Sequence, residues 1–161
     1  DAQESRGLGD VYKRQPLPYL LQLLLEVHGL RSQSGALYSV LAELYSNALE
    51  HGVLKLDSRL KRDAEGFTRY YRERSTRLAQ LQEGFVRVHL QVQPLEAGGR
   101  LVVRVEDSGE GFDVAAVLAR PNDMERLSGR GVSLIRQMSR QAVWADDGRS
   151  VCVEFSWEAL A

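Results

Sequence analysis

Residues 86–107 read VRVHLQVQPLEAGGRLVVRVED, and this stretch decides the fold class. From Val86 to Val92 every second residue is apolar, which is typical of a strand with one buried face. The alternation resumes at residues 101–105, after a glycine-containing loop expected over residues 94–100. Two such strands, adjacent in sequence and joined by a short loop, predict an antiparallel hairpin.

Upstream of this hairpin the spacing of apolar residues changes to three and four, which predicts helices. One helix is expected from Pro16 to Val27 and a second from Ser34 to His51, after which Gly52 suits a C-terminal cap. Residues 55–83 form a charged helical segment, and Gly66 is expected to break it into two pieces.

Downstream of the hairpin, a short helix is expected at residues 114–119 and another near Gly131. Residues 142–145 and 151–157 then predict a last hairpin. The simplest architecture for this order is an α+β two-layer sandwich. Its sheet is mainly antiparallel, its helices lie on one face, and residues 55–83 form a helical insert.

The 161 residues suffice for one ordinary domain, expected over residues 16–161, while residues 1–15 form a leader, a linker or an expression remnant. A net charge of −1 argues against a nucleic-acid binder. The longest apolar stretch, near residues 17–27, is too short and too polar to span a bilayer. The single cysteine, Cys152, forms no internal disulfide, which favours a cytoplasmic location.

Three short segments carry candidate chemistry, and the first is ELYSNALEHG at residues 43–52. Glu43 and Asn47 are four residues apart, so they share one helix face. The carboxamide oxygen of Asn47 is a suitable Mg²⁺ ligand, and the carboxylate of Glu43 can accept a proton from an attacking hydroxyl. The alternative for this pair is a solvated polar face of an amphipathic helix.

The second segment is DSGEG, where a strand ends at Asp107 and is followed by Gly109 and Gly111. Glycines let a backbone pass close to a flat ligand, and an ionised aspartate can accept a hydrogen bond from an exocyclic amine such as that of adenine. The alternative is a tight turn in which Asp107 caps the following element.

The third segment is Gly129-Arg130-Gly131, which opens a helix with an apolar face. The N–H groups at a helix N-terminus bind phosphate, and Arg130 adds a mobile positive charge. An ordinary glycine-rich helix start is the alternative explanation.

Taken in this order, the three segments resemble the N box and the two glycine boxes of the Bergerat-fold (GHKL) ATPases. This superfamily includes gyrase, the Hsp90 chaperones, histidine kinases and the MutL proteins. The resemblance extends over residues 37–155. The pattern Glu-Leu-x-x-Asn-Ala-x-x-His-Gly, the Gly-Arg-Gly segment and the ending at residues 148–155 are most similar to the anti-sigma-factor serine kinases.

This resemblance implies ATP and Mg²⁺ as cofactors. It makes Glu43 the catalytic base, Asn47 the Mg²⁺ ligand and Asp107 the residue that recognises adenine. The remaining nucleotide-binding residues that it implies, together with Arg130, are Gly109, Gly111, Gly129 and Gly131.

The helical insert at residues 55–83 departs from compact members of the family. It looks like the kinase-like module that ends multidomain bacterial response regulators carrying a metal-dependent serine phosphatase domain. Between Lys55 and Arg77 there are eight basic residues and four acidic ones. A solvated helix face is the default explanation, and the alternative is a docking surface that includes Arg72, Arg74 and Arg77.

The resemblance favours a protein-serine kinase that phosphorylates an anti-sigma-factor antagonist. The resemblance also allows a sigma factor or a second copy of the module as a partner. It implies no binding to nucleic acid or to a membrane. Two alternatives stay open: an ATP-binding or anti-sigma binding module with little turnover, and the catalytic domain of a histidine kinase. Against the latter, His28 lacks the surrounding signature of a phosphorylated histidine.

Overall fold

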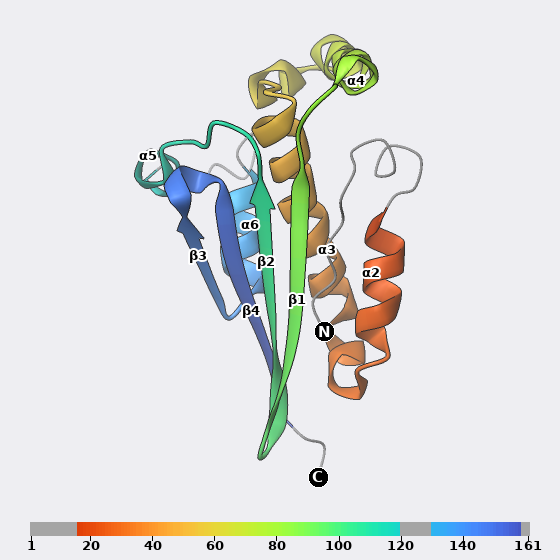
Figure 1. Ribbon diagram of the computed structural model, residues 1–161, viewed down its shortest axis with the longest axis vertical. Coiled ribbons are helices and arrows are strands. Elements are labelled where there is room, and N and C mark those ends of the chain that lie inside the picture. The colour runs from red at the N-terminus through yellow and green to blue at the C-terminus, as the bar shows by residue number, and fades with distance from the viewer. Residues whose placement is uncertain (1–15, 120–129, 159–161) are drawn as a thin grey trace.

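The computed structural model describes residues 16–119 and 130–158 of the chain (Figure 1). Its larger helices are α2 (Pro16–Leu25), α3 (Ser34–Ser46), α4 (Ala64–Gln80), α5 (Val114–Leu118) and α6 (Arg130–Met138). The shorter turns are η1 (His28–Gln33), the π-helical η2 (Asn47–Val53), η3 (Ser58–Arg62) and η4 (Asp146–Gly148). The strands are β1 (Val86–Leu95), β2 (Gly98–Asp107), β3 (Gln141–Ala145) and β4 (Ser150–Glu158).

The four strands form one antiparallel sheet in the order β1-β2-β4-β3. Both expected hairpins are present, and in the first of them Val88 pairs with Val105. The turn between β1 and β2 is only Glu96 and Ala97, so both strands extend into the loop expected over residues 94–100. Further pairing with β4 explains the extension, because it satisfies the backbone groups of β2 as far as Gly98.

One face of the sheet is apolar and packs against the helices in a single hydrophobic core. In Figure 1 the strands lie in front of α3 and α6, and α4 lies above the upper end of β1. The sheet contributes alternate residues of three strands to this core, as the period of two predicts. They are Val86, Val88, Leu90, Leu101, Val103, Val105, Val151, Val153 and Phe155.

The opposite face of the sheet is polar and is crossed by ion pairs between neighbouring strands. Arg87 lies 3.5 Å from Glu106, and Arg100 lies 3.3 Å from Glu154. The expected α+β architecture, with an antiparallel sheet covered by helices, is therefore confirmed. Within the described residues, no helix combines the length and the apolarity that a membrane crossing requires.

The helical insert consists of η3 and α4, but the break between them is not at Gly66. The chain turns at Asp63, which has an extended backbone and accepts a hydrogen bond from the Gly66 N–H at 2.7 Å. Asp63 is thus the N-cap of α4, and Gly66 lies in its first turn. A Cβ on Gly66 would lie 1.9 Å from the Leu60 carbonyl oxygen, so this glycine lets η3 pack closely on α4.

Candidate functional site

The helix that carries Glu43 and Asn47 changes its winding between these two residues. The α-helical hydrogen bonds of α3 end at Ser46, and η2 continues as a π-helix from Asn47. The Asn47 N–H is shared between the carbonyl oxygens of Glu43 and Leu44. Short π-helical turns are rare and are frequent at functional sites, so this junction is a candidate site on structural grounds too.

Burial dominates the electrostatics of Glu43, whose side chain is only partly exposed. Burial raises the pKa of its carboxyl, and the Glu50 carboxylate raises it further. The positive charges of Lys61 and His51 act in the opposite direction. A carboxylate with a raised pKa is better matched to accepting a proton near neutral pH than an exposed glutamate.

Asp107 ends β2 on the face of the sheet that meets the helices, since it pairs with the buried Val86. Its Oδ1 accepts a hydrogen bond from the Gly109 N–H at 2.8 Å. Burial raises the pKa of Asp107, although this hydrogen bond and the charge of Arg149 both lower it. Among the described residues, Oδ2 accepts no hydrogen bond, so one oxygen of a half-buried carboxylate keeps its acceptor capacity.

Gly52 lies directly against Asp107, and this contact was not expected from the sequence. A Cβ on Gly52 would lie 2.5 Å from Asp107 Oδ1, and one on Gly109 would lie 2.2 Å from the Gly52 carbonyl oxygen. The helical residues continue past Gly52 to Val53, and the backbone of Gly52 does not have a positive φ. Gly52 is therefore not a helix cap; it lets the end of η2 approach the glycine segment.

Gly111 has a different role from Gly109. Its φ is +80°, and a Cβ there would lie 2.1 Å from the carbonyl oxygen of Asp147. The next residue, Phe112, donates its N–H to that same oxygen at 2.7 Å. Gly111 thus fixes the glycine segment on the η4 turn between the last two strands, which agrees with the tight-turn explanation for this glycine.

The third segment is described only in part. Gly129 lies outside the described residues, whereas Arg130 and Gly131 begin α6. Helix α6 packs against α3, with Ile135 fully buried in the core. The structure therefore brings the helix that carries Glu43 into contact with the helix that begins at Arg130 and Gly131.

A buried carboxylate that was not singled out in the sequence joins the insert to this site. Glu50 is 6% exposed and accepts hydrogen bonds from the Tyr70 hydroxyl at 2.5 Å and the Ser46 hydroxyl at 3.0 Å. Arg74 Nε and Lys61 Nζ lie 3.4 Å and 3.7 Å from its oxygens. We call these five residues the Glu50 cluster. Glu50 directly follows Ala48 and Leu49, which pack into the core. This position next to buried apolar residues was the sign in the sequence that Glu50 is buried too.

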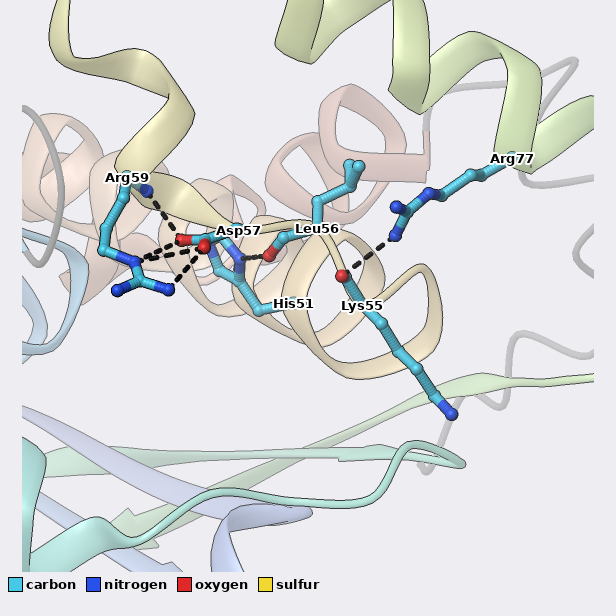
Figure 2. A network of polar contacts seen from close by, with 6 residues as sticks. All are labelled: His51, Lys55, Leu56, Asp57, Arg59 and Arg77. Carbon is cyan, nitrogen blue, oxygen red and sulfur yellow. Dashed lines mark hydrogen bonds and ion pairs between the residues drawn. The ribbon is translucent and has the colours of Figure 1, made fainter.

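Further polar contacts hold the chain between η2 and η3 (Figure 2). The His51 Nδ1 donates to the Leu56 carbonyl oxygen at 2.8 Å, and Arg77 donates to the carbonyl oxygens of Leu54 and Lys55 at 2.7 and 2.9 Å. Arg77 therefore serves the packing of the insert. Of the three arginines expected in the alternative docking surface, Arg74 also contacts Glu50 and Arg77 also contacts backbone carbonyl oxygens, so both have a structural role in the insert.

A cavity of about 530 Å³ lies beside the glycine segment. It is lined by residues 110–114 and by Trp144, Ala145, Asp147 and Gly148. Gly111 belongs to this lining, but Glu43, Asn47 and Asp107 do not. The candidate chemistry thus lies along α3, η2 and the end of β2 rather than in this cavity.

Comparisons with protein-family models, with curated proteins and with solved structures gave no match to the chain. Within residues 16–119 and 130–158, no three His, Cys, Asp or Glu side chains are grouped so as to hold a metal ion by themselves.

Proposed function

We propose that this chain is an ATP- and Mg²⁺-dependent protein-serine kinase domain of the Bergerat (GHKL) type. Its substrate would be an anti-sigma-factor antagonist that presents a serine. The observation that carries the proposal is the contact of Gly52 with Asp107 and Gly109. It joins the end of the Glu43–Gly52 segment to the start of the glycine segment, 55 positions further along the chain.

The proposed role of Asp107 is to accept a hydrogen bond from the adenine amine. Its Oδ1 is held by the Gly109 N–H, so the orientation of the carboxylate is fixed before a nucleotide binds. Oδ2 then supplies the second acceptor in a half-buried setting, where a hydrogen bond to a charged group is strong. Guanine presents a carbonyl oxygen at the equivalent ring position, so the site would favour adenine.

The residues of α3 and η2 fit a Mg²⁺ ion that is bound together with nucleotide phosphates. Mg²⁺ in phosphate-transfer sites retains water and phosphate ligands and takes only one or two oxygens from the protein. The amide oxygen of Asn47 is a hard ligand of the required kind, one helical turn from Glu43. The ion would neutralise charge on the transferred phosphoryl group.

Glu43 would orient the serine hydroxyl of the substrate and accept its proton. Its pKa is raised by burial, which places the carboxylate closer to the working range of a base at neutral pH. Phosphoryl transfer depends mainly on positioning and on charge neutralisation, so a base, one metal ligand and an adenine acceptor form a coherent set.

The test is incubation of the chain with γ-labelled ATP, Mg²⁺ and purified candidate antagonist proteins, followed by mapping of the labelled residue. Label on a serine of the added protein is expected. Glu43→Ala should bind ATP normally and lose about 10²–10⁴-fold in transfer rate. Asn47→Ala should also lose Mg²⁺-dependent ATP binding, whereas the exposed control Glu96→Ala should change neither quantity.

Other outcomes separate the alternatives. ATP binding without transfer to any protein would indicate a binding module with little turnover. Acid-labile label on the chain itself would indicate histidine-kinase chemistry. Glu43→Ala transfer at the wild-type rate would remove Glu43 from the role of base.

A further inference from the structure

The insert places one lysine at the helix face that carries the candidate chemistry. Lys61 belongs to η3, and its Nζ lies 3.7 Å from Glu50 Oε1 and 4.2 Å from the centroid of the Tyr70 ring. The Tyr71 ring centroid is 5.8 Å away. The side chain of Lys61 is 18% exposed, so most of it is packed against its neighbours while part of it reaches the surface.

The hydrogen-bonding capacity of this ammonium is not used up by its neighbours. A separation of 3.7 Å from Glu50 is too long for a hydrogen bond, and within the described residues Lys61 donates none. Glu50 itself is already satisfied by the hydroxyl groups of Tyr70 and Ser46. Lys61 is thus held beside Glu50 by charge and over Tyr70 by the aromatic ring, and its three N–H donors can serve another acceptor.

A polyphosphate bound near Lys61 would lie close to carboxylates and would therefore need a cation beside it. Glu43 and Glu50 lie two turns apart on the helix that also carries Asn47, and the charge of Lys61 acts on both carboxylates. Phosphate groups would be repelled by two carboxylates unless positive charge lies between them. Lysine is a common phosphate ligand because its ammonium is a mobile point charge.

We infer that Lys61 binds the terminal phosphate of ATP at the Glu43–Asn47 face of α3 and η2. This inference rests on the proposed function and adds a residue from the insert to the nucleotide site. It gives the insert a direct role in the reaction, because the terminal phosphate is the group that is transferred.

The experiment compares ATP with ADP, because only ATP carries the terminal phosphate. Affinities of the full chain for both nucleotides, with Mg²⁺, are measured by titration calorimetry for wild type, Lys61→Met and Lys61→Arg. Methionine keeps the packed stem and removes the charge. Lys61→Met should bind ATP about tenfold more weakly and ADP unchanged, and Lys61→Arg should retain most of the ATP affinity.

Arg62→Met is the matched control, since Arg62 is the exposed neighbour in the same turn and should leave both affinities unchanged. A thermal melt of each variant shows whether it is folded. Equal loss of ATP and ADP affinity in Lys61→Met, or no loss of either, would overturn the inference while leaving ATP binding intact. If the wild-type chain binds neither nucleotide, the proposed function fails, and the role of Lys61 fails with it.

Discussion

At the scale of single residues, the half-buried carboxyl of Asp107 lowers the stability of the folded protein when it is ionised, and it also has a proposed role in binding adenine. Its pKa is raised by burial, so the folded protein holds its proton more tightly than the unfolded chain does. The stability that follows from this raised pKa is present below the ordinary value of 3.8 and is lost as the pH rises through the folded-state pKa. The ionised carboxylate therefore destabilises the nucleotide-free protein at neutral pH.

Asp107→Asn tests both aspects of this residue. The asparagine keeps an oxygen for the Gly109 N–H and removes the buried charge, so the melting temperature at neutral pH should rise. This advantage should disappear below the ordinary aspartate pKa of 3.8, where the wild-type carboxyl is protonated too. ATP affinity should fall about tenfold, since the charged acceptor is lost.

Thermal melts at several pH values and titration calorimetry measure the two effects separately. The exposed Glu96→Gln is the control and should leave both unchanged. Unchanged ATP affinity in Asp107→Asn would remove Asp107 from the adenine site. A lower melting temperature at neutral pH would contradict the electrostatic explanation.

At the scale of elements, two adjacent tyrosines of α4 allow a test of how much the contact between the insert and Glu50 contributes to stability. Tyr70 is fully buried and donates its hydroxyl to Glu50, whereas Tyr71 is 43% exposed. Tyr70→Phe leaves a buried carboxylate with one donor fewer and should lower the free energy of unfolding by about 1–3 kcal/mol. Tyr71→Phe should have little effect. Urea denaturation measures both, and equal effects would show that the Glu50 cluster contributes nothing measurable.

Two helical glycines make a second matched pair. Gly66 has the Leu60 carbonyl oxygen where a Cβ would lie, whereas Gly35, near the start of α3, has no atom within 4 Å of that position. Gly66→Ala should destabilise the protein by about 1–3 kcal/mol because η3 and α4 must separate. Gly35→Ala should stabilise it by about 0.5–1 kcal/mol, since alanine favours helices. Denaturation curves in which both variants gain stability would show that η3 and α4 are not closely packed.

At the scale of the whole molecule, nucleotide binding should appear as thermal stabilisation. At a free ATP–Mg²⁺ concentration one hundredfold above the dissociation constant, the native state gains about 2.7 kcal/mol. For a domain of this size that corresponds to a rise of about 5–10 °C in melting temperature.

A thermal melt with ATP and Mg²⁺ measures this rise, with GTP at the same concentration as the control. The rise should be smaller when EDTA removes Mg²⁺, because the proposed contact of Asn47 with the nucleotide acts through the metal ion. GTP should stabilise the protein much less, because it offers Asp107 no amine at the equivalent ring position. The same rise with GTP would contradict adenine recognition, and no rise with ATP would contradict nucleotide binding.

Several features of this protein follow from the sequence alone. Alternation at residues 86–92 and 101–105 predicted β1 and β2, because the pleat of a strand sends successive side chains to opposite faces. The spacing of apolar residues likewise predicted α3 and the helical nature of the insert. The pairing of Glu43 with Asn47 on one face also follows from local geometry, since four residues make about one helical turn.

Other features required the tertiary structure, since they depend on residues far apart in the chain. Gly52 looked like a helix cap but lies against Asp107, and Gly66 looked like a break but packs on Leu60. Local spacing carries no information about such approaches. The charge balance of the insert could not show that Arg74 and Arg77 are committed to Glu50 and to the carbonyl oxygens of the chain. Sequence determined the elements, and packing between them decided what their glycines and charges do.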